Sequence, residues 1–295
     1  MSRLKIVIVM ILWGSIGVFT RFINISPVLL SFVRAVIAIP VLVIIGLATK
    51  SLSFKGVTLK EILPYVLSGV LMAFAWITLF IGFMNTDISI AVIVYNMCPV
   101  YVLLFAPIIL KEKLRRIHVI TVLIAFVGLF LIVFSSIDLS QAKLSGVLFA
   151  ALSGVIYAVI VIINRKAKTS MSATSITFIQ MVFVIITLLP IILVQDLFVE
   201  LYTLDTTAIN LVLILGIVHT GLAYAVYFST YKVLPAVTIG ILSYIDPTSS
   251  MFFAVLILGE TLTIYHVLGG ILILGSTLYC EVYENKLTKA ARLAT

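Results

Sequence analysis

The sequence predicts an all-α integral membrane protein with ten transmembrane helices, arranged as two inverted repeats of five helices each. Three observations support this fold class. Hydrophobic residues make up 63% of the 295 residues and charged residues only 10%, whereas soluble globular proteins carry about 25% charged residues. Apolar segments long enough to cross a bilayer follow one another along the chain. Residues in the two halves also match at a nearly constant offset.

A membrane-spanning helix needs about 20 mostly apolar residues. The segments that meet this requirement are 5–23, 29–48, 62–82, 88–110, 117–135, 144–163, 174–194, 209–231, 236–258 and 265–282. The connectors between them are short and carry Pro, Ser, Asn, Asp or Lys, so we expect no separate soluble domain.

A few residues interrupt these apolar spans. The first span follows Arg3, as a signal peptide would, but no convincing small-residue cleavage site precedes the next span, so we expect it to be retained. The second span contains Arg34, and the eighth contains His219. The fourth and ninth spans each contain a proline about halfway along, Pro99 and Pro247.

Lysines and arginines are distributed unevenly over the span ends. Most of them fall on one set of ends, whereas the other set holds only Arg21 and Lys143, beside acidic residues such as Glu260. Because cytoplasmic loops are enriched in Lys and Arg, we expect a multi-pass protein of the cytoplasmic membrane with both termini cytoplasmic. The net charge of +8 then reflects topology, and we expect no nucleic-acid partner.

The two halves of the chain repeat each other. The pairs that lie 148 residues apart are Pro99 and Pro247, Glu112 and Glu260, His118 and His266, and Trp76 and Tyr224. Five spans is an odd number, so the second repeat must enter the bilayer from the opposite side. We therefore expect a first repeat at residues 1–140 and a second, inverted repeat at residues 141–295. Such repeats with a broken span in each copy are typical of secondary transporters.

Several motifs also point to a known family. In the first half they are Leu12-Trp13-Gly14-Ser15, Arg34, and Pro99 followed by Leu110-Lys-Glu112-Lys-Leu114. In the second half they are Asp246-Pro247, Leu258-Gly-Glu260-Thr-Leu262 and Gly269-Gly270. On these residues the chain resembles the ten-span EamA-type members of the drug/metabolite transporter superfamily over essentially its whole length. Ile156 departs from this pattern, because the family commonly has tryptophan there, and this weakens a symmetric role for Trp13.

The resemblance implies alternating access around a central cavity, lined chiefly by the third, fourth, eighth and ninth spans. The prolines indicate the same place independently. Proline removes a backbone donor and leaves the carbonyl one turn earlier unpaired, which is costly in hydrocarbon unless protein or cavity water satisfies it. We therefore expect Pro99 and Pro247 to mark gating or coupling elements near the midplane. Glu112 and Glu260, at span ends, are interpreted as gate or helix-end contacts.

Asp246 is the strongest candidate for a binding residue. A carboxylate in the middle of an apolar span costs roughly 3 kcal/mol, so it should face the bundle interior. It either binds a substrate amine or a coupling proton, pairs with Arg34, or belongs to the kink at Pro247. Its counterpart in the first repeat is Cys98, so a charge at this position is asymmetric.

Arg34 has three possible arrangements: its side chain snorkels outward, pairs with Asp246, or holds a substrate carboxylate. In the eighth span, Tyr224, Tyr227 and Tyr231 share one helix face. We expect packing for Tyr231. For Tyr224 and Trp76, ordinary packing and a cavity role that includes cation–π attraction both remain open.

Polar residues also precede both prolines. Tyr95 and Asn96 lie before Pro99, and Ser243 and Tyr244 lie before Pro247; Asn96 aligns with Tyr244. Ser243, Asp246 and Ser250 form a polar stripe at helical spacing, which we expect to face the cavity. His219 either titrates in a coupling role or is a neutral, hydrogen-bonded histidine, and we favour the second reading.

The function expected from these features is secondary active transport of a small polar or amphipathic metabolite. An amino acid or related amine, exported in exchange for protons, is preferred, and a quaternary-amine or drug transporter of the same fold is the alternative. An integral-membrane enzyme is the alternative of another class, although no cluster of catalytic residues is evident. We expect no cofactor and no metal. The expected partners are a small-molecule substrate and the lipid bilayer, for a monomer or homodimer.

Overall fold

The computed structural model describes residues 2–109, 115–135, 141–167, 169–231, 242–243 and 245–293. The helices of the first half are α1 (Ser2–Arg21), α2 (Pro27–Ala48), α3 (Leu59–Asn85), α4 (Ile88–Tyr95), α5 (Cys98–Ile109) and α6 (Arg116–Ser135). Those of the second half are α7 (Gln141–Lys166), α8 (Ala173–Val194), the 3-10 helix η1 (Leu197–Thr203), α9 (Thr206–Ile214), the π-helix η2 (Leu215–Leu222), α10 (Ala223–Tyr231), α12 (Ile245–Leu258) and α13 (Ile264–Leu293). The described residues contain no strand.

The helices confirm the predicted all-α membrane fold. Within the described residues, seven helical segments are long and apolar enough to cross a membrane, and three shorter apolar helices accompany them. Together they correspond to the ten expected spans, although the beginning of the ninth lies outside the described residues. Many large side chains on the helix surfaces are exposed, among them Phe130, Leu148 and Leu256. Such surfaces suit a lipid environment.

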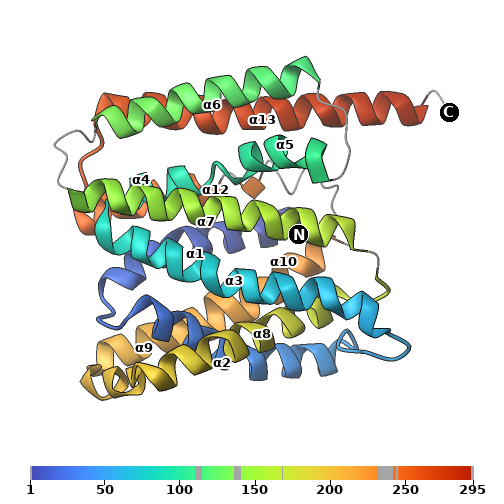
Figure 1. The fold of residues 1–295 in the computed structure, drawn as a ribbon, viewed down its shortest axis with the longest axis vertical. Coiled ribbons are helices and arrows are strands. Elements are labelled where there is room, and N and C mark those ends of the chain that lie inside the picture. The colour runs from blue at the N-terminus through green and yellow to red at the C-terminus, as the bar shows by residue number, and fades with distance from the viewer. Residues whose placement is uncertain are drawn as a thin grey trace.

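The helices lie roughly along one common direction (Figure 1). α6 packs against α13 at one end of the molecule and α2 packs against α8 near the other, while α1, α3, α7 and α12 lie between these pairs. The other contacts come in matching sets. α3 packs on α7 as α1 packs on α10, α3 packs on α8 as α2 packs on η2, and α4 packs on α7 as α12 packs on α1. In each set, the second contact follows from the first when every span is replaced by the corresponding span of the other half.

The two halves cross the bundle in opposite directions. Arg21, at the end of α1, donates from Nη2 to the Thr86 carbonyl at 2.6 Å. Gly146, near the beginning of α7, contacts the same residue, because a Cβ added there would lie 2.8 Å from the Thr86 backbone nitrogen. α1 therefore ends on the face where α7 begins, as expected for an inverted repeat. We call this the Glu260 face, because the Glu260 carboxylate also lies there, bonded to the Ile88 amide at 2.7 Å.

The opposite face is formed by the connectors after α2 and α7. Ser51 donates to Thr174 at 3.0 Å, and the Ser53 amide donates to the Ser175 hydroxyl at 3.1 Å. We call this the Ser51 face. Connectors on the Ser51 face and connectors on the Glu260 face alternate along the chain. This alternation is expected when each span crosses the bundle in the direction opposite to that of the span before it.

The fourth span is broken, as predicted. α4 ends at Tyr95 and α5 begins at Cys98, which places Pro99 in the first turn of α5, where proline is tolerated. Asn96 donates to the Val92 carbonyl at 2.9 Å. The Tyr95 carbonyl, which would bond to residue 99 in a continuous helix, lies 2.9 Å from the position of a Cβ added to Gly154. Two residues thus lie between the end of α4 and the beginning of α5 in the middle of the bundle.

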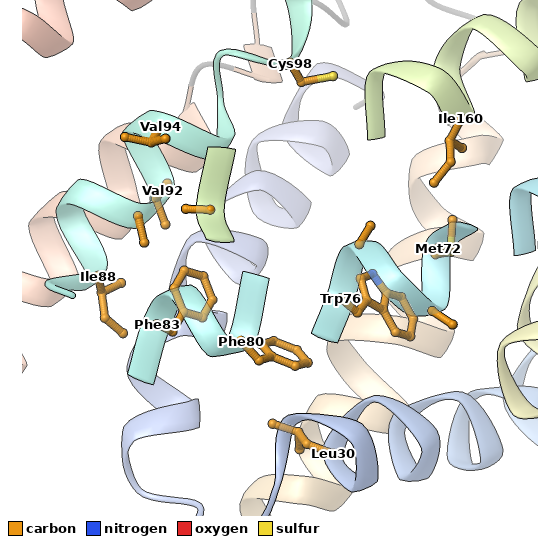
Figure 2. Packing of buried hydrophobic residues seen from close by; sticks show 14 of the residues in the cluster. Leu30, Met72, Trp76, Phe80, Phe83, Ile88, Val92, Val94, Cys98 and Ile160 are labelled. Carbon is orange, nitrogen blue, oxygen red and sulfur yellow. The ribbon is translucent and has the colours of Figure 1, made fainter. Parts of the chain in front are cut away.

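The buried core surrounds this break. Trp76, Phe80 and Phe83 of α3 lie between Leu30 of α2 and Val92 of α4 (Figure 2). All five residues belong to one cluster of buried hydrophobic side chains that extends through both halves. Packing of this core fixes the walls of the cavity described next.

Candidate functional site

A cavity of about 570 Å³ lies at the centre of the bundle, within the range of 300–1,000 Å³ that is usual for small-molecule sites. Side chains from both halves of the chain line it. The predicted site residues among them are Arg34, Trp76, Tyr95, Asn96, Pro99, Tyr224, Ser243 and Asp246. The structure therefore brings together residues that are far apart in the sequence and that were selected for their charge or polarity in apolar spans.

Arg34 is buried, with 3% of its surface exposed, so the outward-snorkelling arrangement is wrong. Its Nε and Nη2 atoms donate to Oγ1 of Thr220 at 3.3 Å and 3.2 Å. Its guanidinium lies over the ring of Trp76, 4.7 Å from the centroid, and 5.3 Å from that of Phe80. No ion pair joins Arg34 and Asp246, although both residues are described, so the second arrangement is also wrong.

Thr220 belongs to the π-helix η2, which interrupts the eighth span. Its hydroxyl donates to the Leu215 carbonyl, five residues earlier, at 2.8 Å. The neighbouring His219 also faces a carbonyl five residues earlier, with Nδ1 3.3 Å from the Ile214 oxygen. Nothing in the sequence predicted this change of helix type. It turns the side chain of Thr220 toward α2 and that of His219 toward α1.

His219 lies beside the cavity rather than in its wall. It is buried, and its Nε2 atom lies 2.9 Å from the Ser15 hydroxyl. Its carbonyl accepts a hydrogen bond from the Trp13 indole at 2.9 Å, and its ring lies 5.1 Å from that of Phe19 at an interplanar angle of 59°. This arrangement fits the hydrogen-bonded histidine that the sequence favoured and ties α1 to the π-helix.

Asp246 lies in the first turn of α12 and lines the cavity. Ser250, one turn later on the same helix, also lines the cavity and is 1% exposed. Its hydroxyl has no hydrogen-bond partner in the described residues. Buried hydroxyl groups without a partner are costly, and this one is available to a molecule in the cavity. The predicted polar stripe of Ser243, Asp246 and Ser250 therefore does face the cavity.

Aromatic rings form much of the cavity wall. Trp13 lies 5.1 Å from Tyr224 and 4.9 Å from Tyr227, measured between ring centroids. Tyr157 lies 5.8 Å from Tyr95 on another part of the wall. Rings at these separations attract one another and offer faces to apolar groups or cations. Tyr224 thus both packs against Trp13 and lines the cavity, and the two readings of this residue are not exclusive.

Some predicted positions lie elsewhere. Pro247 is buried in the first turn of α12 but does not line the cavity. Tyr244, Glu112 and the side chain of Tyr231 lie outside the described residues. Conversely, sequence reasoning did not assign the cavity residues Trp13, Tyr157, Tyr227 and Arg165 to the site. The helical spacing of Tyr227 relative to Tyr224 was a usable signal for Tyr227.

At the Glu260 face, Glu260 joins the connector after α12 to α4. The Glu260 carboxylate accepts from the Ile88 amide at 2.7 Å, from the Ser89 amide at 3.0 Å and from the Ser89 hydroxyl at 2.6 Å. It thus caps the beginning of α4, as expected for a helix-end contact. Toward the Ser51 face, the cavity lining reaches Arg165, an exposed residue in the last turn of α7.

Comparison with known proteins decides the family. The model of the EamA-like transporter family matches residues 2–134 and 144–280. The chain belongs to the EamA-like transporter family. The two matched segments fall one in each expected repeat, while the division between residues 140 and 141 stays a prediction. Membership of this EamA family indicates a transporter embedded in a membrane rather than an enzyme.

Individual relatives agree with this assignment. An uncharacterized transporter of Bacillus subtilis (strain 168), YxxF, is 30% identical over 272 residues, covering 92% of this chain and 86% of the relative. A Salmonella typhimurium (strain LT2) protein named probable amino-acid metabolite efflux pump is 25% identical over 200 residues, 63% of this chain and 64% of that protein. A crystal structure of another protein superposes with a TM-score of 0.61 at 20% identity, covering 96% of this chain and 97% of that one. This last match shows a shared fold.

Proposed function

We propose that this EamA-family protein is a secondary active transporter that exports an amino acid or a related amine across the cytoplasmic membrane in exchange for protons. One observation carries the proposal. The same cavity receives a guanidinium from α2 and, from α12, a carboxylate with an unpartnered hydroxyl one turn away. A zwitterionic amino acid carries the complementary pair of charges. The name of the Salmonella relative points in the same direction.

Each end of such a substrate has a partner in the cavity. Arg34 binds the substrate carboxylate, because a guanidinium presents parallel N–H groups that match two carboxylate oxygens. Asp246 binds the ammonium group, and Ser250 accepts one of its N–H bonds. The aromatic and aliphatic walls, including Trp76 and Val102, surround the substrate side chain. An apolar side chain suits these walls, so L-leucine is a suitable probe.

Proton exchange follows from the single carboxylate. Asp246 holds either a proton or the ammonium group of the substrate, because both occupy the same oxygen atoms. Intramembrane carboxylates of this kind serve as proton relays in transporters. Binding of substrate on the cytoplasmic side then releases a proton there, and protonation on the outer side releases the substrate.

The conformation described here is proposed to face the cytoplasm. The Glu260 face, where Glu260 caps α4, is assigned to the outside and is taken to be the closed side. The Ser51 face, which carries Lys50 and Lys55, is assigned to the cytoplasm because of its positive charge. Cysteine labelling tests the assignment in a variant without the buried native thiols of Cys98 and Cys280. A cysteine at Lys55 should be labelled only from the cytoplasm and one at Thr261 only from outside, and the reverse pattern would contradict the orientation.

The functional proposal is tested by transport into proteoliposomes. Radiolabelled L-leucine should enter vesicles faster when the lumen is acidic than when there is no pH gradient, because protons leaving the lumen drive the exchange. A panel of other amino acids and amines extends the assay. If no member of the panel is transported, or if transport ignores the pH gradient, the proposal of proton-coupled export is wrong.

A second candidate substrate is an organic cation such as a quaternary amine. The cluster of Trp13, Tyr224 and Tyr227 favours it, because aromatic faces attract cations without a hydrogen bond. The two candidates differ in their need for Arg34. Arg34→Gln should strongly slow transport of an amino acid but should preserve or improve transport of a quaternary amine such as choline, since it removes a like charge from the cavity.

A further inference from the structure

The π-helix holds a group that is well placed to aim Arg34. Thr220 is fully buried, and its hydroxyl carries one proton, which it donates to the Leu215 carbonyl at 2.8 Å. The oxygen is therefore left with its lone pairs for Arg34, whose Nε and Nη2 atoms lie at 3.3 Å and 3.2 Å. Both bonds fall on the same side edge of the guanidinium.

We infer that Thr220 is a positioning residue for the substrate's anionic group: its hydroxyl holds the side edge of Arg34, so that the outer edge of the guanidinium faces the cavity. The inference rests on the proposed function, in which Arg34 binds a carboxylate. It assigns the specificity for that carboxylate to a residue that does not itself touch the substrate.

The π-helix is what brings the hydroxyl to Arg34. In the α-helical parts of the chain, threonine hydroxyls bond to carbonyls three or four residues earlier, as Thr78 does with Ala75 and Phe74. Thr220 instead bonds five residues earlier, in keeping with the wider turn of a π-helix. Single π turns inside α-helices are often found at functional sites.

Two glycines allow α2 to approach this turn closely. A Cβ added to Gly216 would lie 2.5 Å from Cβ of Ile37, and one added to Gly221 would lie 2.6 Å from Cγ1 of Val41. Both distances are shorter than van der Waals contact, so no larger residue fits without moving a helix. Arg34, Ile37 and Val41 follow one another at helical spacing, which sets Arg34 on the face of α2 that meets η2.

The face of the guanidinium is fixed as well as its edge. It lies over Trp76 at 4.7 Å and near Phe80 at 5.3 Å. With one edge on Thr220 and one face on the aromatic rings, the group has little freedom to rotate. Nη1 makes no hydrogen bond to any described residue, and Arg34 lines the cavity. Its remaining N–H groups are therefore available to a carboxylate, which forms strong paired bonds when the geometry is held in advance.

The test compares two ligands that differ only in the carboxylate, L-leucine and 3-methylbutylamine. Binding is followed by tryptophan fluorescence in a Trp13→Phe background, since the chain contains two tryptophans and Trp76 then becomes the single reporter beside Arg34. In Thr220→Val, the dissociation constant for L-leucine should rise about tenfold, as expected for a lost hydrogen bond to a charged group. That for the amine should change less than about twofold. Thr220→Ser keeps the hydroxyl and should restore L-leucine binding.

A matched variant separates positioning from a general loss of stability. Thr78→Val removes another buried threonine hydroxyl that bonds only to its own helix and does not line the cavity, so it should leave both affinities unchanged. If Thr220→Val weakens both ligands equally, or weakens neither, the positioning role is wrong.

The emission of Trp76 without ligand keeps the inference testable if the proposed function fails. If L-leucine does not bind the parent protein, the amino-acid proposal fails by itself. Thr220→Val should still shift the emission, because the guanidinium leaves its place over the ring, whereas Thr220→Ser should not. Identical spectra for the valine variant and its parent would then overturn the positioning role.

Discussion

The two halves of the chain make the same cross-repeat contact with different chemistry. In one copy, Arg34 of α2 donates to Thr220 in the eighth span. In the other, Gln180 of α8 donates from Nε2 to the Ser68 hydroxyl of α3 at 2.8 Å. Arg34 and Gln180 are equally buried, each 3% exposed, but only Arg34 lines the cavity. The two repeats thus make equivalent hydrogen-bonded contacts between helices, but only the contact made by Arg34 involves a charged side chain.

The fourth and ninth spans also correspond to each other but differ in charge. Cys98 and Asp246 occupy matching positions in the fourth and ninth spans, and both line the cavity. Only Asp246 carries a carboxylate. Apart from the exposed Arg165, the described cavity lining therefore holds one anion, Asp246, and one cation, Arg34, each contributed by a different repeat. We interpret the matching helices of the two repeats as the machinery of alternating access and the two unmatched charges as the device that selects the substrate.

The largest effect is expected from Asp246→Asn, which makes the ninth span as uncharged as the fourth. The variant should remain in the membrane but lose transport of L-leucine in the proteoliposome assay, because neither proton nor ammonium then has a carboxylate to occupy. Cys98→Ser is the matched change in the other repeat and should retain most of the activity. Full transport by Asp246→Asn with an unchanged response to the pH gradient would refute the coupling role.

Arg34→Gln should have the next largest effect, since it gives the first repeat the residue of the second. Loss of a charged, hydrogen-bonded partner should weaken L-leucine binding by roughly 10- to 100-fold, which corresponds to about 1.5–3 kcal/mol. Calorimetric titration of the purified protein measures this affinity. Gln180→Leu is the control: it removes the equivalent link away from the cavity, so it should lower the thermal stability without a comparable loss of affinity.

Gly14→Ala should have a moderate effect. Together with Gly154→Ala, it compares the crossing of α1 and α12 with the equivalent crossing of α7 and α4. A Cβ added at Gly14 would lie 2.7 Å from the Asp246 carbonyl oxygen and 2.9 Å from the Ser250 nitrogen, so α12 must move away from α1. Overpacking of this kind costs about 1–3 kcal/mol, and it also shifts the two proposed ammonium ligands. Gly154→Ala crowds the Tyr95 carbonyl at 2.9 Å in the other repeat.

The readouts for these glycine variants are the melting temperature and the affinity for L-leucine. Both should fall in Gly14→Ala, whereas Gly154→Ala should lower mainly the melting temperature. Gly275→Ala is the neutral reference, because within the described part of the chain no atom outside its own helix backbone and chain neighbours lies within 4 Å of a Cβ added there. If Gly14→Ala behaves like Gly275→Ala in both measurements, the close crossing does not hold Asp246 in place.

The smallest effect is expected from Ser89→Ala at the Glu260 face, which the proposed function takes to be the closed side. This change removes one of the three hydrogen bonds that hold the Glu260 carboxylate, and a single such bond contributes only about 1 kcal/mol. Labelling of a cysteine introduced at Phe83, in the cavity wall, should become a few times faster from the Glu260 face. Labelling that is unchanged would show that this hydroxyl does not help to close the cavity.

Much of the fold was predictable because lipid imposes strong rules on a sequence. Apolar runs of sufficient length defined the spans, and a charge within such a run singled out Asp246 as an interior residue and Arg34 as a candidate for one. The direction of those side chains was not predictable in the same way. Whether Arg34 reached Asp246, Thr220 or the bilayer surface depends on how two distant helices cross, and one sequence carries little information about that.

The π-helix is the clearest example of a feature that could not be predicted from the sequence. The segment Leu215–Leu222 contains no proline and reads as an ordinary part of an apolar span. Its two glycines, Gly216 and Gly221, fit closely against α2, so the wider turn depends on tertiary packing rather than on local preference. The roles of Thr220 and of the unpartnered Ser250 hydroxyl followed only from the assembled structure.

The central claim is that one cavity binds both charged groups of its substrate: Arg34 binds the carboxylate and Asp246 binds the ammonium group. Its most direct test is a set of calorimetric titrations of L-leucine, 3-methylbutylamine and 4-methylpentanoate into the parent protein, Arg34→Gln and Asp246→Asn. The parent should prefer L-leucine, Arg34→Gln should lose the preference over the amine, and Asp246→Asn should lose the preference over the acid. If both variants weaken all three ligands by the same factor, neither residue recognises a particular charge and the account is contradicted.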